Sequence, residues 1–127
     1  MIQIFLPILL AAGFSQAVAP STLSPAQADS LFRAETGKPA FHLLDVRTPE
    51  EFAQGHLKGA KLVDIKSPQF DSIIATLPRK EGYFVYCRSG HRSGMAVERM
   101  TALGFQHVQH LAGGIGAWSA AGLPIEP

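Results

Sequence analysis

The chain has a single cysteine and almost no net charge, and both scarcities exclude classes of protein. One cysteine, Cys87, cannot form an intramolecular disulfide, so a disulfide-stapled scaffold is excluded. Eleven basic and ten acidic residues leave a net charge of +1, which gives no electrostatic reason to expect a nucleic acid or an acidic membrane as partner. The 127 residues contain no internal repeat, charge run or low-complexity tract. We therefore expect one domain, preceded by a short extra segment.

The N-terminal segment differs in kind from the rest of the chain. Residues 1–19 contain no charged side chain, and residues 4–14 are almost wholly apolar. Small residues follow and form two candidate cleavage sites, after Ala17 and after Ala19. The pattern predicts a secretory signal peptide over residues 1–19 and hence a periplasmic or secreted protein. The alternatives are a core helix or an uncleaved membrane anchor, but the apolar run is short for a span and Pro7 interrupts it.

The mature domain is predicted over residues 20–127, with no stable membrane association after cleavage. Along it, strands and helices alternate, which predicts an α/β fold with an open parallel sheet and helices on both faces. Capping boxes that begin at Ser24 and Thr48 predict the starts of two helices. The expected strands are 41–46, 62–65, 83–86 and about 107–111. The expected helices are 25–35, one from Thr48 to Gly55, one opened by Ser67-Pro68, one from about Ser93 to Gly104, and one after Gly113-Gly114.

Ligands of an open parallel sheet bind beyond the carboxyl ends of its strands. Asp45, Asp64 and Cys87 each end a predicted strand, and Gly113-Gly114 follows a fourth. We therefore expect these residues to gather along one edge of the sheet, with Cys87 among them.

The loop after Cys87 has the composition of a turn that binds anions and activates a thiol. It runs through residues 87–94, between a predicted buried strand and a predicted helix, and is polar, basic or glycine throughout, a poor setting for an inert core thiol. Backbone N–H groups and the helix N-terminus would lower the pKa of the thiol and stabilise an anion on its sulfur. Arg88 and Arg92 would offer forked donors to an oxyanion. His91 is either a pH-sensitive cation or a plain loop residue.

Three segments together resemble the rhodanese family of sulfurtransferases. Residues 45–60 resemble its N-terminal signature, residues 86–93 its active-site loop, and residues 113–124 its C-terminal signature. The three occur in the family's order and span most of residues 41–124. With the leader, the chain is similar to the small single-domain rhodaneses that bacteria export to the periplasm.

The resemblance implies a two-step sulfur transfer at Cys87. The thiolate would attack the outer sulfur of thiosulfate, or a related persulfide donor, and a thiol or cyanide would then remove the sulfur from the resulting persulfide. The implied partners are thus a small anionic sulfur donor and a thiol acceptor; no cofactor is implied, and a monomer is expected. Asp45 and Arg47 match positions that, by the resemblance, would support the site without reacting; a salt bridge that only stabilises the fold is the favoured alternative. The residues implied to bind substrate and persulfide are Arg88, Ser89, Gly90, His91, Arg92 and Ser93.

The sequence fits two other functions and a metal site less well. A dual-specificity phosphatase has its phosphate-binding arginine at Cys-x5-Arg, whereas Arg92 gives Cys-x4-Arg and Ser93 holds the next position. A sulfur-carrier, redox-sensing or protein-binding module without turnover is the other alternative, and the complete cysteine loop argues for an enzyme. No metal site is expected, because His107 and His110 lie three residues apart on a predicted strand and so on opposite faces.

Overall fold

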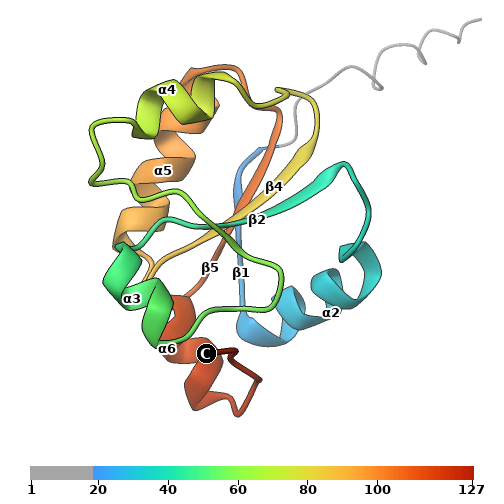
Figure 1. Cartoon of the computed structure of the whole chain (residues 1–127). Coiled ribbons are helices and arrows are strands. Elements are labelled where there is room, and N and C mark those ends of the chain that lie inside the picture. Colours follow the sequence, from blue (N-terminus) through green and yellow to red (C-terminus); the bar gives the residue numbers. More distant parts are fainter. Residues whose placement is uncertain (1–18) are drawn as a thin grey trace, which may run out of the picture.

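A five-stranded parallel sheet organises the structure, a computed structural model that describes residues 19–127 (Figure 1). The strand order is β1-β5-β4-β2-β3, and every neighbouring pair is parallel. The predicted α/β fold with an open parallel sheet is therefore confirmed. The strands are β1 (Ser21–Leu23), β2 (Phe41–Asp45), β3 (Lys61–Leu62), β4 (Gly82–Tyr86) and β5 (His107–Leu111).

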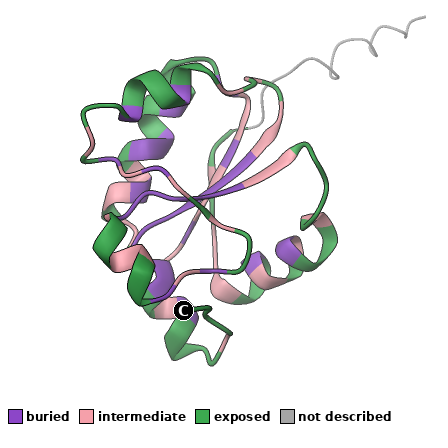
Figure 2. Cartoon of the chain, in the orientation of Figure 1, coloured by how far each residue is buried: buried purple, intermediate pink, exposed green. Residues whose placement is uncertain are grey.

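Helices cover both faces of this sheet. They are α2 (Pro25–Glu35), α3 (Pro49–Gln54), α4 (Phe70–Ala75), α5 (His91–Ala102) and α6 (Gly114–Ala120). Successive side chains of a strand point to opposite faces. Along β4, Tyr83 and Val85 pack with α4 and α5, whereas Phe84 and Tyr86 pack with α2 and α6. Figure 2 shows the result, with buried residues concentrated along the central strands and on the inward sides of the helices.

Local sequence signals determine where two of the helices begin. The hydroxyl of Ser24 accepts the N–H of Gln27 at 3.2 Å, and that of Thr48 accepts the N–H of Glu51 at 3.3 Å. Both predicted capping boxes are complete, and α2 has the predicted bounds. Gly55 ends α3 with a φ of 150°, which a residue with a side chain rarely adopts.

The structure corrects three expectations. β1 was not predicted, since three residues are too few for an alternating pattern to show. β3 ends at Leu62, so Asp64 does not end a strand; its carboxylate instead accepts the N–H of Lys66 at 2.8 Å. The helix expected from Ser67-Pro68 begins only at Phe70, because the Ser67 hydroxyl first accepts the N–H of Gln69 in a turn.

The predicted signal peptide falls on residues 1–18 and Ala19, and only Ala19 is among the described residues. Within residues 19–127, none of the helices combines the length and the apolar character needed to cross a membrane.

Candidate active site

Cys87 lies directly after β4, at the base of the loop that leads into α5. The residue is 1% exposed. The N–H groups of Gly90 and Ser93 donate to its sulfur at 3.1 and 3.3 Å, and the Ser93 hydroxyl lies 3.5 Å from it. Gly90 has a φ of 106°, in the left-handed region that glycine adopts without strain. This conformation lets the loop fold back over the sulfur atom.

The surroundings of Cys87 favour its thiolate. Burial alone would raise the pKa of the thiol, because a charge loses its hydration in the interior. The hydroxyl and N–H of Ser93 and the N–H groups of Gly90 and Ser89 outweigh burial, and the net effect is a lowered pKa. These hydrogen bonds favour the thiolate, and the catalytic role of the loop stays a prediction.

The N-terminus of α6 is joined to the first two residues of the loop. The N–H groups of Ile115 and Gly116 donate to the carbonyls of Cys87 and Arg88 at 2.9 and 3.1 Å. Gly114 approaches so closely that a Cβ on it would lie 2.4 Å from the Arg88 carbonyl. Gly113-Gly114 thus lies at the same edge as Cys87, as predicted, and glycine at position 114 follows from this approach.

The two loop arginines differ in their surroundings. Arg92 forms a forked ion pair with Glu51 of α3, with N–O distances of 2.7 and 2.9 Å. Its donors are therefore directed at a carboxylate of this chain, whereas the sequence had suggested a substrate oxyanion. Arg88 is exposed, and its guanidinium makes no hydrogen bond or ion pair with the described part of the chain. Ser89 and His91 are also exposed.

The ion pair of Glu51 predicts a pH-dependent stability. Its hydrogen bonds to Arg92 lower the pKa of Glu51 from 4.5 to about 2. A carboxylate with a lowered pKa stabilises the fold above its unfolded pKa, and this contribution is lost as the pH falls through the folded pKa. Glu51→Gln should therefore reduce the free energy of unfolding by about 1 kcal/mol at neutral pH, and the difference from wild type should vanish as the pH approaches about 2.

Denaturant unfolding at several pH values measures this difference. Glu50→Gln is the matched control, because Glu50 is an exposed acid in the same first turn of α3 and shares its interaction with the helix dipole. The prediction would be contradicted if Glu51→Gln lowered the free energy of unfolding by the same amount at every pH, or by no more than Glu50→Gln does.

Asp45 and Arg47 form a buried ion pair at the end of β2. Asp45 is 0% and Arg47 5% exposed. The guanidinium donates to both carboxylate oxygens, at 2.7 Å from Nη2 and 3.0 Å from Nε at the shortest, and Nη2 also donates to the Gly55 carbonyl at 2.6 Å. The pair therefore links the end of β2 to the end of α3, and its support of the active site stays a prediction.

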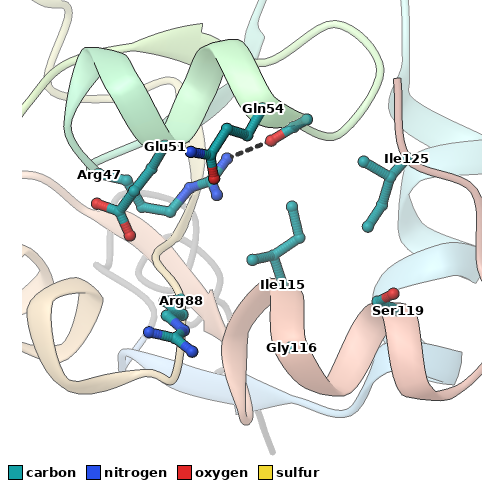
Figure 3. Close-up of a pocket in the computed structure, with 9 residues that line it drawn as sticks. Arg47, Glu51, Gln54, Arg88, Ile115, Gly116, Ser119 and Ile125 are labelled. Carbon is teal, nitrogen blue, oxygen red and sulfur yellow. Dashed lines mark hydrogen bonds between the residues drawn. The ribbon is translucent and has the colours of Figure 1, made fainter. Parts of the chain in front are cut away.

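A pocket of about 430 Å³ opens beside the loop, between α3 and α6 (Figure 3). Arg88 faces it from the loop, and Arg47, Glu51 and Gln54 line it from the opposite side. Ile115 and Ile125 supply its apolar surface. The other lining residues are Gly55, Gly116 and Ser119.

Two residues close to the site were missed as site residues in the sequence. Glu51 was assigned to the Thr48 capping box and to the N-terminal family segment, without a role at the active site. His110 was considered only as a metal ligand, and that site was rejected. His110 lies 3.0 Å from the Ser93 hydroxyl through Nδ1, whereas His107 lines a groove beside Leu31 of α2. The two histidines thus lie on opposite faces. In the described range, no three His, Cys, Asp or Glu residues come together as a metal site.

Residues 27–121 match the family model of the rhodanese-like domain. The chain belongs to the rhodanese family. It is 36% identical over 117 residues to thiosulfate sulfurtransferase 16, chloroplastic, of Arabidopsis thaliana, covering 84% of this chain and 93% of that protein. It is 36% identical over 74 residues to thiosulfate sulfurtransferase PspE of Escherichia coli, covering 58% and 71%.

Solved structures agree with the family. A rhodanese-related protein from Thermoplasma volcanium superimposes with a TM-score of 0.71 at 27% identity, covering 84% of this rhodanese and 97% of that chain. The family model covers the segments 45–60 and 86–93 in full, and the segment 113–124 as far as residue 121. The recognition of the family from these segments is confirmed.

Proposed function

We propose that this rhodanese is a sulfurtransferase that moves a sulfane sulfur from thiosulfate, or a related persulfide donor, through Cys87 to a thiol acceptor. In the first step the Cys87 thiolate attacks the outer sulfur of thiosulfate, the S–S bond breaks, and sulfite leaves with the electron pair. In the second step the acceptor thiolate attacks the outer sulfur of the persulfide. The persulfide S–S bond then breaks, and its electron pair returns to Cys87 as the thiolate.

The observation that carries this proposal is the ring of donors around the Cys87 sulfur. Both forms of Cys87 in this reaction, the thiolate and the ionised persulfide, carry negative charge, and N–H donors stabilise anions through charge-assisted hydrogen bonds. Gly90 and Ser93 supply such donors at 3.1 and 3.3 Å. The lowered pKa of Cys87 fits the same role, because the thiolate is the attacking species.

We assign the two arginines different roles in this reaction. The exposed guanidinium of Arg88 at the pocket is suited to meet the oxyanion of the donor. Arg92, paired with Glu51, is suited to hold the loop against α3. The pocket beside Arg88 offers room for the acceptor.

A phosphatase reaction has less support. Position 93, where Cys-x5-Arg would require an arginine, holds a fully buried serine whose hydroxyl lies near the sulfur. A carrier or sensing module without turnover remains the alternative, and the following test separates it from an enzyme.

The test is the intact mass of the purified protein before and after incubation with thiosulfate. A sulfurtransferase should gain the mass of one sulfur atom and lose it again on addition of cyanide. Protein whose only cysteine has first been alkylated is the control and should gain nothing. A wild-type mass unchanged by thiosulfate would contradict thiosulfate as donor, and a sulfur retained in the presence of cyanide and thiols would indicate a carrier.

We also propose that residues 1–19 direct export, so that the domain acts in the periplasm or outside the cell. Support comes from the apolar, uncharged leader and its small residues. The same spectrum, recorded on protein from a periplasmic fraction, would identify a mature N-terminus after Ala17 or Ala19.

A further inference from the structure

A continuous chain of hydrogen-bonding groups connects the Cys87 sulfur to the protein surface, away from the pocket. The Ser93 hydroxyl lies 3.5 Å from the sulfur and 3.0 Å from Nδ1 of His110. On the far side of the imidazole ring, Nε2 lies 3.1 Å from the Thr22 hydroxyl. Cys87 and Ser93 are buried, His110 is half-buried and Thr22 is exposed. The proposed sulfur transfer uses Ser93 but neither His110 nor Thr22.

The sheet register determines this arrangement. Thr22 of β1 stands directly opposite His110 of β5, so the two side chains lie on the same face of the sheet. That face is the one covered by α5, which supplies Ser93. The imidazole ring is thus held between an exposed hydroxyl on the edge strand and a buried hydroxyl beside the reactive sulfur.

Ser93 has one hydroxyl hydrogen and several acceptors for it. Besides the sulfur, the Gly90 carbonyl lies 3.2 Å from its oxygen and Nδ1 of His110 lies 3.0 Å away. If Nδ1 carries no hydrogen, it competes with the sulfur for the hydrogen of Ser93. If Nδ1 carries a hydrogen, it donates to the Ser93 oxygen, and the hydroxyl hydrogen is left for the sulfur or the Gly90 carbonyl.

We propose that His110 is a positioning residue that, as the Nδ1–H tautomer, turns the Ser93 hydroxyl hydrogen toward the anionic sulfur of Cys87. Thr22 then donates its hydroxyl hydrogen to Nε2 and holds the ring in this tautomer. No proton is transferred along the chain in this role; the three hydrogens are only oriented. The inference rests on the proposed role of Cys87 as a thiolate. Burial lowers the pKa of His110, so the neutral ring, in which this choice of tautomer exists, is the prevailing form at neutral pH.

Two substitutions at position 110 distinguish the contact made by Nδ1 of His110 from the contact made by Nε2. The side-chain amide of asparagine reaches about as far as Nδ1, and that of glutamine about as far as Nε2. His110→Asn should therefore keep a partner for Ser93, whereas His110→Gln should keep a partner for Thr22 and lose the one for Ser93. His107→Gln is the matched control, because His107 lies on the same strand but on the opposite face.

The readout is the pKa of Cys87, titrated through the ultraviolet absorbance of its thiolate. Cys87 is the only cysteine, so the signal has one source. Burial raises the pKa of Tyr83 to about 12 and that of Tyr86 further, so neither tyrosine interferes. Loss of one oriented hydrogen bond to the thiolate should lower the acid dissociation constant of Cys87 by about fivefold. We expect His110→Gln to raise the pKa of Cys87 by about 0.7, and His110→Asn and His107→Gln to leave it within about 0.2 of wild type.

A second comparison tests whether His110 acts through Ser93. In a Ser93→Ala background, His110→Gln should produce no further rise in the pKa of Cys87, because the hydroxyl it orients is gone. An unchanged pKa in His110→Gln, or an additional rise in the Ser93→Ala background, would overturn the proposal.

Thermal unfolding of each variant checks that it is folded. If His110→Gln does not fold, Thr22→Val provides the test from the exposed end of the chain, and it should raise the pKa of Cys87 by about 0.3; no rise would overturn the proposal. The readout does not involve sulfur transfer. A wild type that gains no sulfur from thiosulfate would therefore contradict the proposed function without affecting this inference, and a null result at position 110 would leave the proposed function standing.

Discussion

Cys87→Ser should reduce thiosulfate-dependent turnover by about 10⁴-fold or more, to the uncatalysed background. A serine hydroxyl is not ionised near neutral pH, and its oxygen cannot carry a sulfane sulfur as a persulfide does. The smaller oxygen can still accept the N–H groups of Gly90 and Ser93, so the loop should keep its conformation. Sulfite release measures turnover, and thermal unfolding within a few degrees of wild type verifies the fold.

Cys87→Ala separates loss of the nucleophile from loss of the loop. It should be equally inactive but less stable than Cys87→Ser, because the buried N–H of Ser93 and the partly buried N–H of Gly90 would then lack an acceptor. Turnover near the wild-type rate in either variant would place the sulfur-carrying group outside Cys87 and end the proposed mechanism.

Asp45→Ala should cost about 3 to 5 kcal/mol of unfolding free energy, the largest loss of stability expected of any charged residue in the described part of the chain. The substitution leaves the Arg47 guanidinium buried, with the Gly55 carbonyl as its remaining hydrogen-bond acceptor and the Tyr86 ring 5.6 Å away. A buried charge without its counter-ion has lost its hydration and gained little in return. Denaturant unfolding measures the change in free energy.

Two control variants make this prediction specific. Asp29→Ala removes a carboxylate from an exposed pair with Arg33, in which the arginine side chain is 78% exposed, and should cost less than about 1 kcal/mol. Asp45→Ala combined with Arg47→Met removes both buried charges and should recover much of the lost stability. Equal losses from Asp45→Ala and Asp29→Ala would show that the buried pair contributes no more than a surface one.

The ion pairs Asp45–Arg47 and Glu51–Arg92 are connected to each other through α3, and the second one contacts the active-site loop. Arg47 fixes the end of α3 through the Gly55 carbonyl, and α3 carries Glu51, which holds Arg92 of the loop. Damage to the buried pair should therefore reach the loop through α3, although neither Asp45 nor Arg47 contacts Cys87 among the described hydrogen bonds.

Features encoded within a few residues were predictable from the sequence. The caps at Ser24 and Thr48, the bounds of α2 and β5, and the position of Cys87 after a buried strand all follow from local patterns. The alternation of strands and helices was sufficient to predict the sheet and the edge on which Cys87 lies.

Features that depend on distant partners were not predictable. Glu51 illustrates this, because its role in the capping box explained the residue and gave no reason to look for Arg92, 41 positions away. β1 is a strand only because it pairs with β5, so the Thr22–His110 contact could not be anticipated. Asp64 was misplaced because the apolar residues around it are buried without continuing the strand.

The near-complete burial of Cys87 would give the proposed sulfur transfer a preference between two products. A persulfide has two electrophilic sulfur atoms. Attack on the outer one delivers sulfur to the acceptor, whereas attack on the inner one would join the acceptor to the protein as a mixed disulfide and release hydrosulfide. The loop encloses the Cys87 sulfur, which would be the inner atom of the proposed persulfide, so an incoming thiolate would meet the outer atom first. The fold would thereby protect the protein from being trapped by the acceptor.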